Sequence, residues 1–214
     1  MREEFDMITI WLRIGSLALL WACCTAAGAG GGPLGMDHIL ALDESGIWSR
    51  HNQTLVQDLS ALSVLGGALW EGNDTRLGKT FWKATDSMLL ANASAAVAKR
   101  VFRRARPING NDPNDWFGPS THQSFPSGEV THIAAVVTPF IAEYAKDQPA
   151  IWGLAALPAY VGIARMKSQA HWQTEVLAGA ALGAGIGYYA QQRENAWTAT
   201  VLPRGLTVGF RHSF

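Results

Sequence analysis

The chain has 214 residues, of which 48% are hydrophobic, so it is long enough to form one domain with a sizeable core. Its 17 Lys and Arg residues balance 17 Asp and Glu residues, which gives a formal net charge of zero at pH 7. This balance argues against a nucleic-acid partner, because proteins that bind nucleic acids present strongly basic surfaces.

The N-terminus has the pattern of an export signal. An apolar run over residues 14–24 follows Arg13, and small residues at 25–27 offer a cleavage site. We therefore predict a signal peptide over residues 1–29, with Met7 as an alternative start. A permanent membrane anchor is the other interpretation, although the apolar run is shorter than the roughly 20 residues that a membrane span needs.

The only two cysteines, Cys23 and Cys24, lie within this signal. Cleavage after Ala27 would leave a mature chain without cysteine, and therefore without disulfide or thiol chemistry. The signal predicts an exported protein that is periplasmic or associated with a membrane.

The next part of the chain predicts a linker followed by two helical regions. Residues 30–36 are rich in Gly and Pro and offer little to a core. Between residues 37 and 70 leucines recur at helical spacing, although Gly66-Gly67 is expected to interrupt the helix. Residues 82–102 predict a longer helix with alanines on one face.

A polar loop over residues 108–123 leads into three apolar segments, at 130–144, 151–163 and 176–190. Each segment is shorter than a membrane span, which favours an all-α bundle of about six helices over residues 37–201. An integral membrane enzyme is the alternative. Residues 202–214 contain alternating apolar positions and predict a short extended tail.

Glycine recurs at every fourth position of the last apolar segment, at Gly179, Gly183 and Gly187. A glycine inside a helix costs about 1 kcal/mol relative to alanine, so a compensating interaction is needed. We expect this helix to pack closely against another backbone at the centre of the core.

A block of basic residues precedes Pro107. On a continuous helix, Lys99, Arg103 and Arg106 would share one face, and Pro107 would end the helix just after Arg106. Like charges converge at a cost unless an anion neutralises them, and guanidinium groups match phosphate oxygens. A solvated basic face or a contact with anionic lipids is the alternative interpretation.

A helix start is predicted at Pro126-Ser127-Gly128. Proline suits the entry to a helix, serine can cap it, and glycine lets a ligand approach the backbone closely. The free N–H groups and the dipole of a helix start favour an anion there.

Arg165 is followed by His171 and Glu175, which lie four residues apart. On a helix, the Glu175 carboxylate can reach the His171 imidazole. A histidine held through one ring nitrogen has the other nitrogen available as nucleophile or base. A structural contact between the two side chains is the alternative.

In this order, Lys99-x6-Arg106-Pro107, Pro126-Ser127-Gly128 and Arg165-x5-His171-x3-acid resemble the signature of the type 2 phosphatidic acid phosphatase superfamily. That superfamily also includes class A acid phosphatases and vanadium-dependent haloperoxidases. The resemblance covers residues 99–175, about a third of the chain, and all three motifs are present.

The resemblance implies an all-α bundle of the acid phosphatase and haloperoxidase type, with a pocket between helix ends. The residues implied to hold the phosphate oxygens are Lys99, Arg106, Ser127, Gly128 and Arg165. His171, paired with Glu175, would attack phosphorus and form a phosphohistidine that water then hydrolyses. No metal ion or other cofactor is implied, since the cations supply the charge stabilisation. An oxidant enzyme with vanadate in the same pocket is a further alternative.

The sequence departs from the family pattern at Glu129, where the family has a histidine that protonates the leaving oxygen. Glu129 can donate that proton only while it is protonated, and a carboxylate repels phosphate. Nearby Arg and Lys charges favour the charged form of Glu129, whereas apolar burial would favour the protonated form, and the sequence leaves both open. General acid catalysis is worth about 10²–10⁴-fold, so this change bears directly on activity. Smaller departures are Glu175 in place of Asp and Ala164 in place of Ser. His132, one helical turn further on, is interpreted as a structural histidine.

The sequence therefore predicts a metal-independent phosphatase that hydrolyses or transfers phosphate from a monoester or from a lipid-linked phosphate or diphosphate. Because of Glu129, the alternative is a catalytically impaired or non-catalytic relative that binds a phosphorylated ligand in the cell envelope. The expected partner is a phosphorylated small molecule or lipid, and contact with a membrane surface stays open. Trp116 and Phe117, in the polar loop, would touch a lipid tail or anchor the loop to the core.

Overall fold

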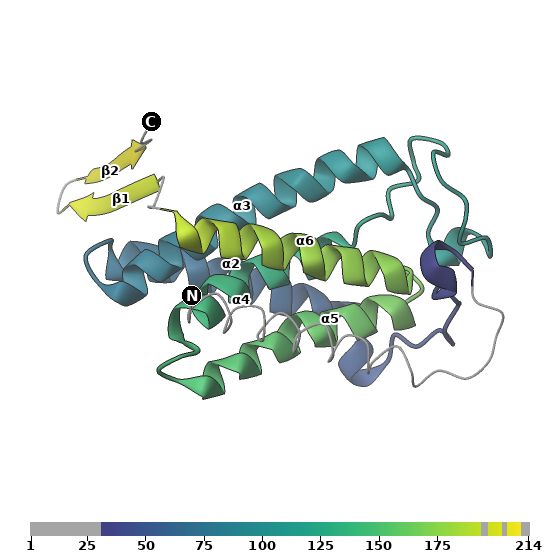
Figure 1. Cartoon of the computed structure of the whole chain (residues 1–214), viewed down its shortest axis with the longest axis horizontal. Coiled ribbons are helices and arrows are strands. Elements are labelled where there is room, and N and C mark those ends of the chain that lie inside the picture. Colours follow the sequence, from purple (N-terminus) through teal and green to yellow (C-terminus); the bar gives the residue numbers. More distant parts are fainter. Residues whose placement is uncertain (1–30, 194–196, 203–204, 211–214) are drawn as a thin grey trace, which may run out of the picture.

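The computed structural model describes residues 31–193, 197–202 and 205–210. The predicted signal peptide lies outside these residues. Within them, five α-helices form an elongated bundle (Figure 1). Their bounds are α2 Arg50–Glu71, α3 Arg76–Phe102, α4 Gly128–Tyr144, α5 Ala156–Lys167 and α6 Gln173–Gln192. The predicted all-α class is confirmed, with short 3₁₀ segments joining several of the helices.

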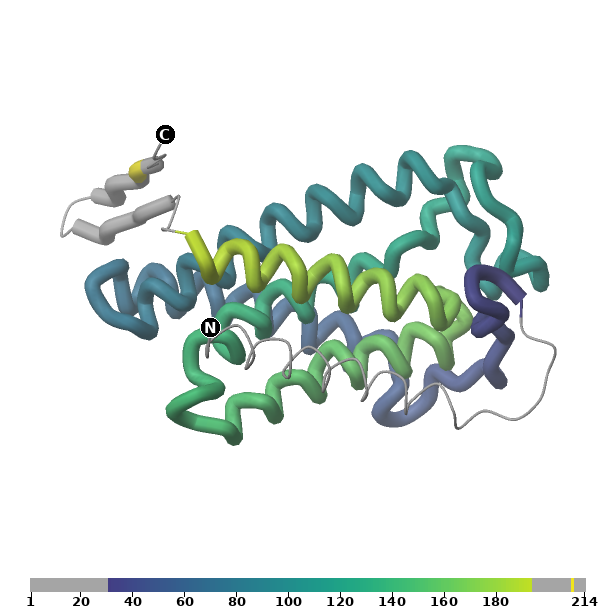
Figure 2. Tube along the Cα trace, in the orientation of Figure 1, coloured from purple at the N-terminus to yellow at the C-terminus, as the bar shows by residue number. Residues whose placement is uncertain are grey.

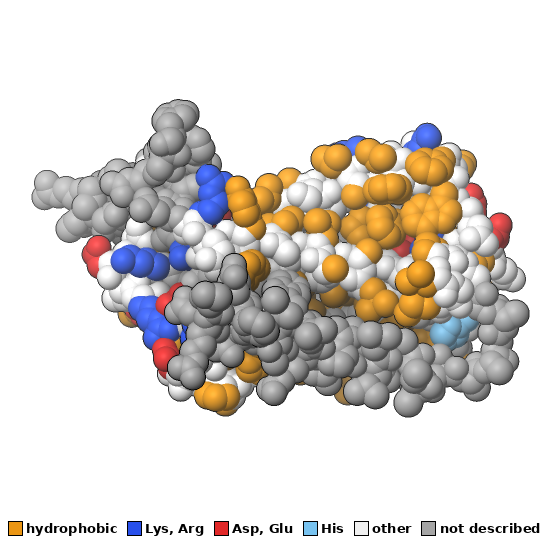
Figure 3. Space-filling model, viewed as in Figure 1, with side chains coloured by type: hydrophobic (Ala, Val, Ile, Leu, Met, Phe, Trp, Pro, Cys, Tyr) orange, Lys and Arg blue, Asp and Glu red, His pale blue; other side chains and the backbone are white. Residues whose placement is uncertain are grey.

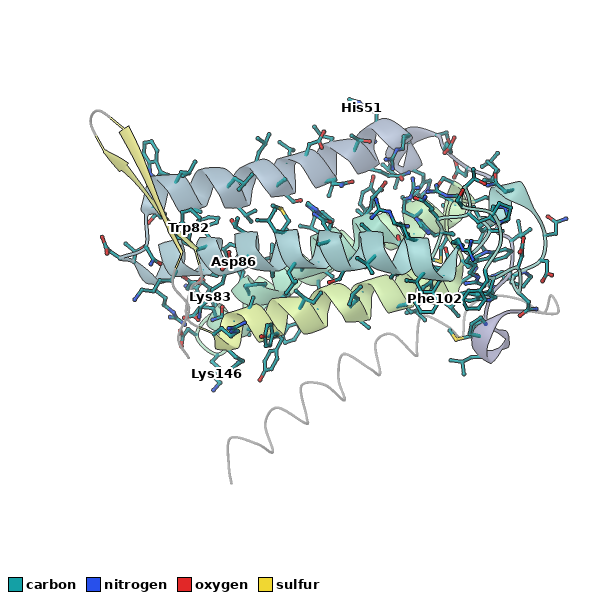
Figure 4. The ribbon with its side chains drawn as sticks, turned by 90° about the horizontal axis from the view of Figure 1, so that it is seen from above. His51, Trp82, Lys83, Asp86, Phe102 and Lys146 are labelled. Atoms are coloured by element: carbon teal, nitrogen blue, oxygen red, sulfur yellow. The ribbon has the colours of Figure 1, made fainter. Side chains whose placement is uncertain are left out.

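The helices run alternately up and down the bundle, so one end of it collects five helix termini. The starts of α2, α4 and α6 and the ends of α3 and α5 all lie at this end (Figures 1 and 2). In the view from above, His51 near the start of α2 and Phe102 at the end of α3 mark this end, and side chains crowd it (Figure 4). We call it the loop end, because the long loop between α3 and α4 also folds there.

Helix α4 supplies much of the core. It packs against each of the other four helices. Its buried apolar residues in the core are Val130, Ile133, Val136, Val137 and Ile141. At about 25 cal/mol per Å² of apolar surface removed from water, this burial is the main stabilising contribution to the bundle.

The glycines of α6 let it approach the α4 backbone closely, as predicted. A Cβ atom added at Gly183 would lie 2.2 Å from the carbonyl oxygen of Thr131, and one at Gly179 would lie 2.6 Å from that of Ser127. No larger side chain fits there without moving α4. The contact fixes the start of α4 relative to the start of α6.

Residues 31–49 cross the loop end and tie α5 and α6 together. Asp37 is buried and accepts hydrogen bonds from the backbone N–H and the hydroxyl of Thr174, at 2.8 and 2.7 Å. The side chain of Gln169 donates to the carbonyl oxygen of Leu40 at 2.8 Å. Part of the Gly- and Pro-rich stretch predicted as a linker is thus paired, since Gly31 and Asp37 form a β-bridge.

The structure corrects two boundaries. Gly66-Gly67 does not interrupt α2, because the Phe81 ring of α3 packs directly on Gly67, where a Cβ would lie 2.5 Å from it. The extended segment expected over residues 202–214 begins earlier, as the strand β1 (Trp197–Leu202), which pairs antiparallel with β2 (Gly205–Phe210).

Candidate active site

Lys99 lies in the last turn of α3 and holds the loop that precedes α4. Its ammonium donates to three carbonyl oxygens, those of Gln123 at 2.9 Å, Ser124 at 3.0 Å and Pro126 at 2.7 Å. These acceptors use all three of its hydrogens. Burial and the nearby Arg106 charge lower the pKa of Lys99 to about 8.

The start of α4 offers donors that the described residues leave unused. Ser127 is the N-cap residue, but its buried Oγ has no hydrogen-bond partner among the described residues, so the predicted side-chain cap is not formed. The Nε of Arg165 is likewise buried and without a hydrogen-bond partner in the described part of the chain. A buried donor without a partner lowers the stability of the fold by about 1–3 kcal/mol. The Ser127 hydroxyl and the Arg165 Nε are therefore suited to bind an anionic ligand.

Arg165 reaches the same place from the last turn of α5. It is 6% exposed, and its Nη1 donates to the side-chain oxygen of Gln53 at 3.1 Å. Burial lowers the pKa of Arg165 to about 10, which keeps the guanidinium charged at neutral pH.

His171 and Glu175 form the predicted contact. The His171 Nδ1 lies 2.9 Å from a Glu175 carboxylate oxygen, although His171 precedes α6 and only Glu175 is within the helix. The same carboxylate oxygen accepts from the Ser124 hydroxyl at 2.5 Å and from the Trp172 N–H at 3.2 Å. The glutamate thus orients the imidazole and directs Nε2 away from itself.

Burial, together with the surrounding positive charges, keeps the His171 ring neutral. Burial, followed by the charges of Lys99, Arg165 and Arg106, lowers the pKa of His171 well below its ordinary value. Burial raises the pKa of Glu175 to about 7, against the opposing effect of Ser124 and of its other polar partners. A neutral imidazole among cations is the protonation state that a nitrogen nucleophile requires.

Arg104 was not predicted as a site residue, yet it forms an ion pair with Glu175. Its guanidinium is fully buried, 2.6 Å from an Asp37 carboxylate oxygen and 3.4 Å from a Glu175 carboxylate oxygen. It also stacks over the Trp116 ring at 4.4 Å. Nothing in the sequence distinguished Arg104 from the other arginines of its block.

The predicted helical face of Lys99, Arg103 and Arg106 is wrong. Helix α3 ends at Phe102, because Arg103 adopts a left-handed conformation with φ 40° and ψ 51°. Arg106 therefore lies beyond the helix, where its charge still lowers the pKa of both Lys99 and His171. Among the described residues, the Arg106 guanidinium has no hydrogen-bond or ion-pair partner.

Glu129 points at two arginines. One of its carboxylate oxygens lies 2.5 Å from Nη1 of Arg50, and the other lies 3.6 Å from Nε of Arg165. Arg50 and Gln53 come from the first turn of α2 and were not predicted as site residues. The structure thus brings Glu129 to the same end of the bundle as Lys99, Arg165 and His171.

His132 has a structural environment. Its Nε2 lies 3.1 Å from the Ser60 hydroxyl and its Nδ1 lies 3.0 Å from the Asn92 amide. Both ring nitrogens therefore have partners, in agreement with the interpretation as a structural histidine.

Two features are absent from the described residues. Within residues 31–193 and the two strands, no group of three or more His, Cys, Asp or Glu side chains is arranged to hold a metal ion. In the same part of the chain, no helix combines the length and the apolar character needed to cross a bilayer.

Comparison with known families adds a decisive match. Residues 80–198 match the family model of the PAP2 superfamily, which is more than half of the chain. The chain belongs to the PAP2 superfamily. The three motifs of this PAP2 protein all lie within the matched region, whereas Arg50 and Gln53 precede it.

Two curated relatives of this PAP2 protein are named lipid A 1-phosphatase. The one from Porphyromonas gingivalis is 30% identical over 159 residues, which are 71% of this chain and 33% of the relative. The one from Rhizobium johnstonii is 32% identical over 109 residues, which are 49% of this chain and 42% of the relative. The chain thus spans less than half of the length of either relative.

A solved structure, that of LpxE from Aquifex aeolicus, has the same fold. It superposes with a TM-score of 0.51 at 19% sequence identity, over 66% of this chain and 84% of that one. This likeness supports the helical architecture of the PAP2 protein described above.

Proposed function

We propose that this protein is a metal-independent phosphatase that uses His171 as its nucleophile. The observation that carries the proposal is the buried, neutral His171, whose Nδ1 is held by Glu175 while the charges of four cations act on it. The unused donors of Ser127 and Arg165 supply a place for phosphate oxygens. Preorganised donors of this kind are usually the largest contribution to catalysis of phosphoryl transfer.

In the proposed reaction, Arg106, Arg165 and the start of α4 at Ser127 and Gly128 bind the phosphate oxygens. Lys99 acts through its charge, since its hydrogens are used by carbonyl groups. The Nε2 lone pair of His171 attacks phosphorus, the ester P–O bond breaks, and the leaving oxygen takes its electrons and a proton. Water then attacks phosphorus, the P–N bond breaks, and phosphate and free His171 are regenerated.

The proton for the leaving oxygen comes from Glu129 when it is protonated, or from solvent. As a carboxylate, Glu129 pairs with Arg50 and Arg165 instead. The second candidate function, a relative that binds a phosphorylated ligand without turning it over, rests on this ion pairing. Replacement of Glu129 by His separates the two: a jump from no turnover to turnover favours the second candidate, whereas brisk wild-type turnover removes it.

A lipid-linked phosphate is the proposed substrate class. Both named relatives are lipid A 1-phosphatases. Hydrophobic side chains gather over α3 and α6 on one face of the molecule (Figure 3). An open, largely apolar surface on α3 is formed by Ala93, Ser94, Val97, Ala98, Val101 and Phe102. It lies on the last turns of α3, which also carry Lys99, so acyl chains can lie on it while the phosphate reaches His171. We therefore propose contact with a membrane surface in the cell envelope.

The test compares a soluble chromogenic phosphate ester with a phosphorylated lipid in mixed micelles, by release of inorganic phosphate. The proposal predicts hydrolysis of both, a preference for the lipid, and loss of at least about 10³-fold with His171→Ala, as expected when a nucleophile is removed. Wild-type activity that survives His171→Ala would contradict the mechanism. Trp116→Ala and Phe117→Ala test whether these loop side chains contact the lipid tail or anchor the loop to the core. Both rings pack near Phe102, at 6.1 and 6.3 Å between ring centroids.

A further inference from the structure

We infer that Arg50 belongs to the phosphate site and that Glu129 competes with a bound phosphate for Arg50 and Arg165. The inference rests on the proposed function, because it adds one cation and one competing carboxylate to the same site. Arg50 lies outside the region that matches the family model and outside all three motifs.

One buried amide places the two arginines side by side. The side-chain oxygen of Gln53 accepts from Arg165 Nη1 at 3.1 Å and from Arg50 Nη1 at 3.4 Å. Gln53 is fully buried, and its nitrogen donates to the Trp48 carbonyl oxygen at 2.8 Å, which fixes the orientation of the amide. Arg50 is therefore positioned by the same residue that positions Arg165.

Arg50 is also electrostatically part of the site. Its positive charge contributes, after burial and other charges, to the lowered pKa of both Arg165 and His171. The charged groups that act on this place are four cations, Arg50, Lys99, Arg106 and Arg165, and three carboxylates, Glu44, Glu129 and Glu175. With four cations against three carboxylates, the site keeps a positive excess that suits an anionic phosphate.

Glu129 bonds closely to only one of the two arginines. It bonds closely to Arg50, but its second oxygen is buried, has no hydrogen-bond partner among the described residues, and lies 3.6 Å from Arg165 Nε. A phosphate has more oxygens and more negative charge than the Glu129 carboxylate. It can therefore bond to the guanidinium groups of both Arg50 and Arg165 at shorter distances. Arg50 is 51% exposed and Glu129 is 14% exposed, so Arg50 is accessible from solvent beside the more buried carboxylate.

The arrangement also accounts for a carboxylate in a phosphate site. Where the family has a histidine, this chain has an added negative charge, and Arg50 supplies a positive charge within 2.5 Å of it. Arg50 thereby keeps the net charge of the site positive. As a consequence, Glu129 and the phosphate compete for the same hydrogen-bond donors.

The experiment measures the Kd for inorganic phosphate by calorimetry at pH 7 for the full chain and four variants. We expect Glu129→Gln to bind phosphate about tenfold more tightly than wild type, since one competing charged hydrogen bond is removed. Arg50→Gln should bind more weakly, and the double variant should bind about tenfold more weakly than Glu129→Gln alone.

The double variant decides the inference. If Arg50 served only to neutralise Glu129, its removal from the Glu129→Gln background would leave the Kd unchanged, and that result would overturn the inference. So would an unchanged or weaker Kd in Glu129→Gln itself. Arg76→Gln is the matched control, because Arg76 is also 51% exposed and lies 2.5 Å from a glutamate, Glu143, at the opposite end of the bundle.

Turnover is measured separately, so the two proposals can fail separately. The expected order of Kd values in a chain that hydrolyses no ester would refute the catalytic proposal and support the role of Arg50. Hydrolysis that depends on His171, with a Kd insensitive to Arg50 in the Glu129→Gln background, would do the reverse.

Discussion

Single residues around His171 carry an unusual amount of buried charge. Arg104, Asp37 and Glu175 are each at most 1% exposed and lie within one connected set of contacts. Burying such groups is expensive, and each is tolerable only while its partners are present. The set therefore behaves as a unit that fixes the Glu175 carboxylate, and through it the His171 ring.

Removal of Arg104 tests this unit. We expect Arg104→Gln to lower the free energy of unfolding by about 3–5 kcal/mol, because Asp37 and Glu175 then lack a buried counter-charge. Urea denaturation followed by circular dichroism measures the change. Arg103→Gln, at the adjacent position, is the control and should change stability by less than about 0.5 kcal/mol. Equal effects of the two substitutions would mean that the buried contacts contribute little.

Lys99 should make phosphate binding weaker at alkaline pH. Because burial lowers its pKa to about 8, the ammonium loses its charge as the pH rises through that value, and phosphate binding should weaken there. In Lys99→Arg the guanidinium stays protonated, so the fall in affinity between pH 7 and 9 should largely disappear. Phosphate titrations at the two pH values measure this, and a parallel fall in both proteins would exclude Lys99 as the titrating group.

Some of these residues were predictable from sequence and others were not. The contact between His171 and Glu175 was predicted from their spacing of four residues, and it forms although His171 lies just before the first turn of α6. Asp37 and Gln53 reach the site from segments distant in sequence, and no spacing links them to it. Their roles depend on how residues 31–49 and α2 fold against α5 and α6, which no local pattern specifies.

At the scale of elements, the packing of α6 on α4 positions both His171, the proposed nucleophile, and the start of α4, where we propose that phosphate binds. The Ser127 N–H donates to the Glu175 carbonyl oxygen at 3.1 Å, so the starts of the two helices are joined directly. Any change that separates the helices should therefore affect stability and catalysis together.

Two glycines of α6 form a matched pair for this test. A methyl group at Gly183 would lie 2.2 Å from a carbonyl oxygen of α4, whereas one at Gly185 would meet nothing within 4 Å. We expect Gly183→Ala to destabilise the protein by about 1–3 kcal/mol through overpacking. Gly185→Ala should instead stabilise it by up to about 1 kcal/mol, through helix propensity. Thermal unfolding of the two variants measures the difference, and similar melting temperatures would contradict the close approach.

Apolar periodicity predicted most helices well, but not where they end. The helix predicted over residues 82–102 does end at Phe102, but the basic face expected to continue as far as Arg106 is not formed, because the chain turns at Arg103 to return along the loop end. In α2 the opposite error occurred: Gly66-Gly67 suggested a break, but a ring from α3 occupies the space that side chains would take. Both outcomes depend on tertiary packing, which overrides local propensity.

At the scale of the whole molecule, the cluster of positive charges lies next to an exposed apolar surface. The cations gather at the loop end, while α3 carries exposed apolar residues toward that end. The exposed residues of α3 include Leu89, Leu90, Val97 and Val101. This arrangement suits an enzyme that takes a phosphate headgroup from a lipid surface.

The apolar face of α3 can be tested apart from the chemistry. Val97→Asp combined with Val101→Asp should reduce the ratio of lipid to soluble-ester hydrolysis by about tenfold, since two apolar contacts are replaced by charges. Leu62→Asp on α2 is the control, because Leu62 is 65% exposed and Val97 is 59% exposed. An unchanged ratio in the double variant would place the lipid elsewhere.

The central claim is that His171 receives the phosphoryl group. The most direct measurement quenches the protein in base during turnover of a phosphate ester and locates the phosphoryl group by mass spectrometry of peptides. The account predicts a phosphohistidine at His171 that is stable to base, labile to acid, and absent from His171→Ala. A phosphoryl group on another residue, or turnover in His171→Ala at the wild-type rate, would contradict it.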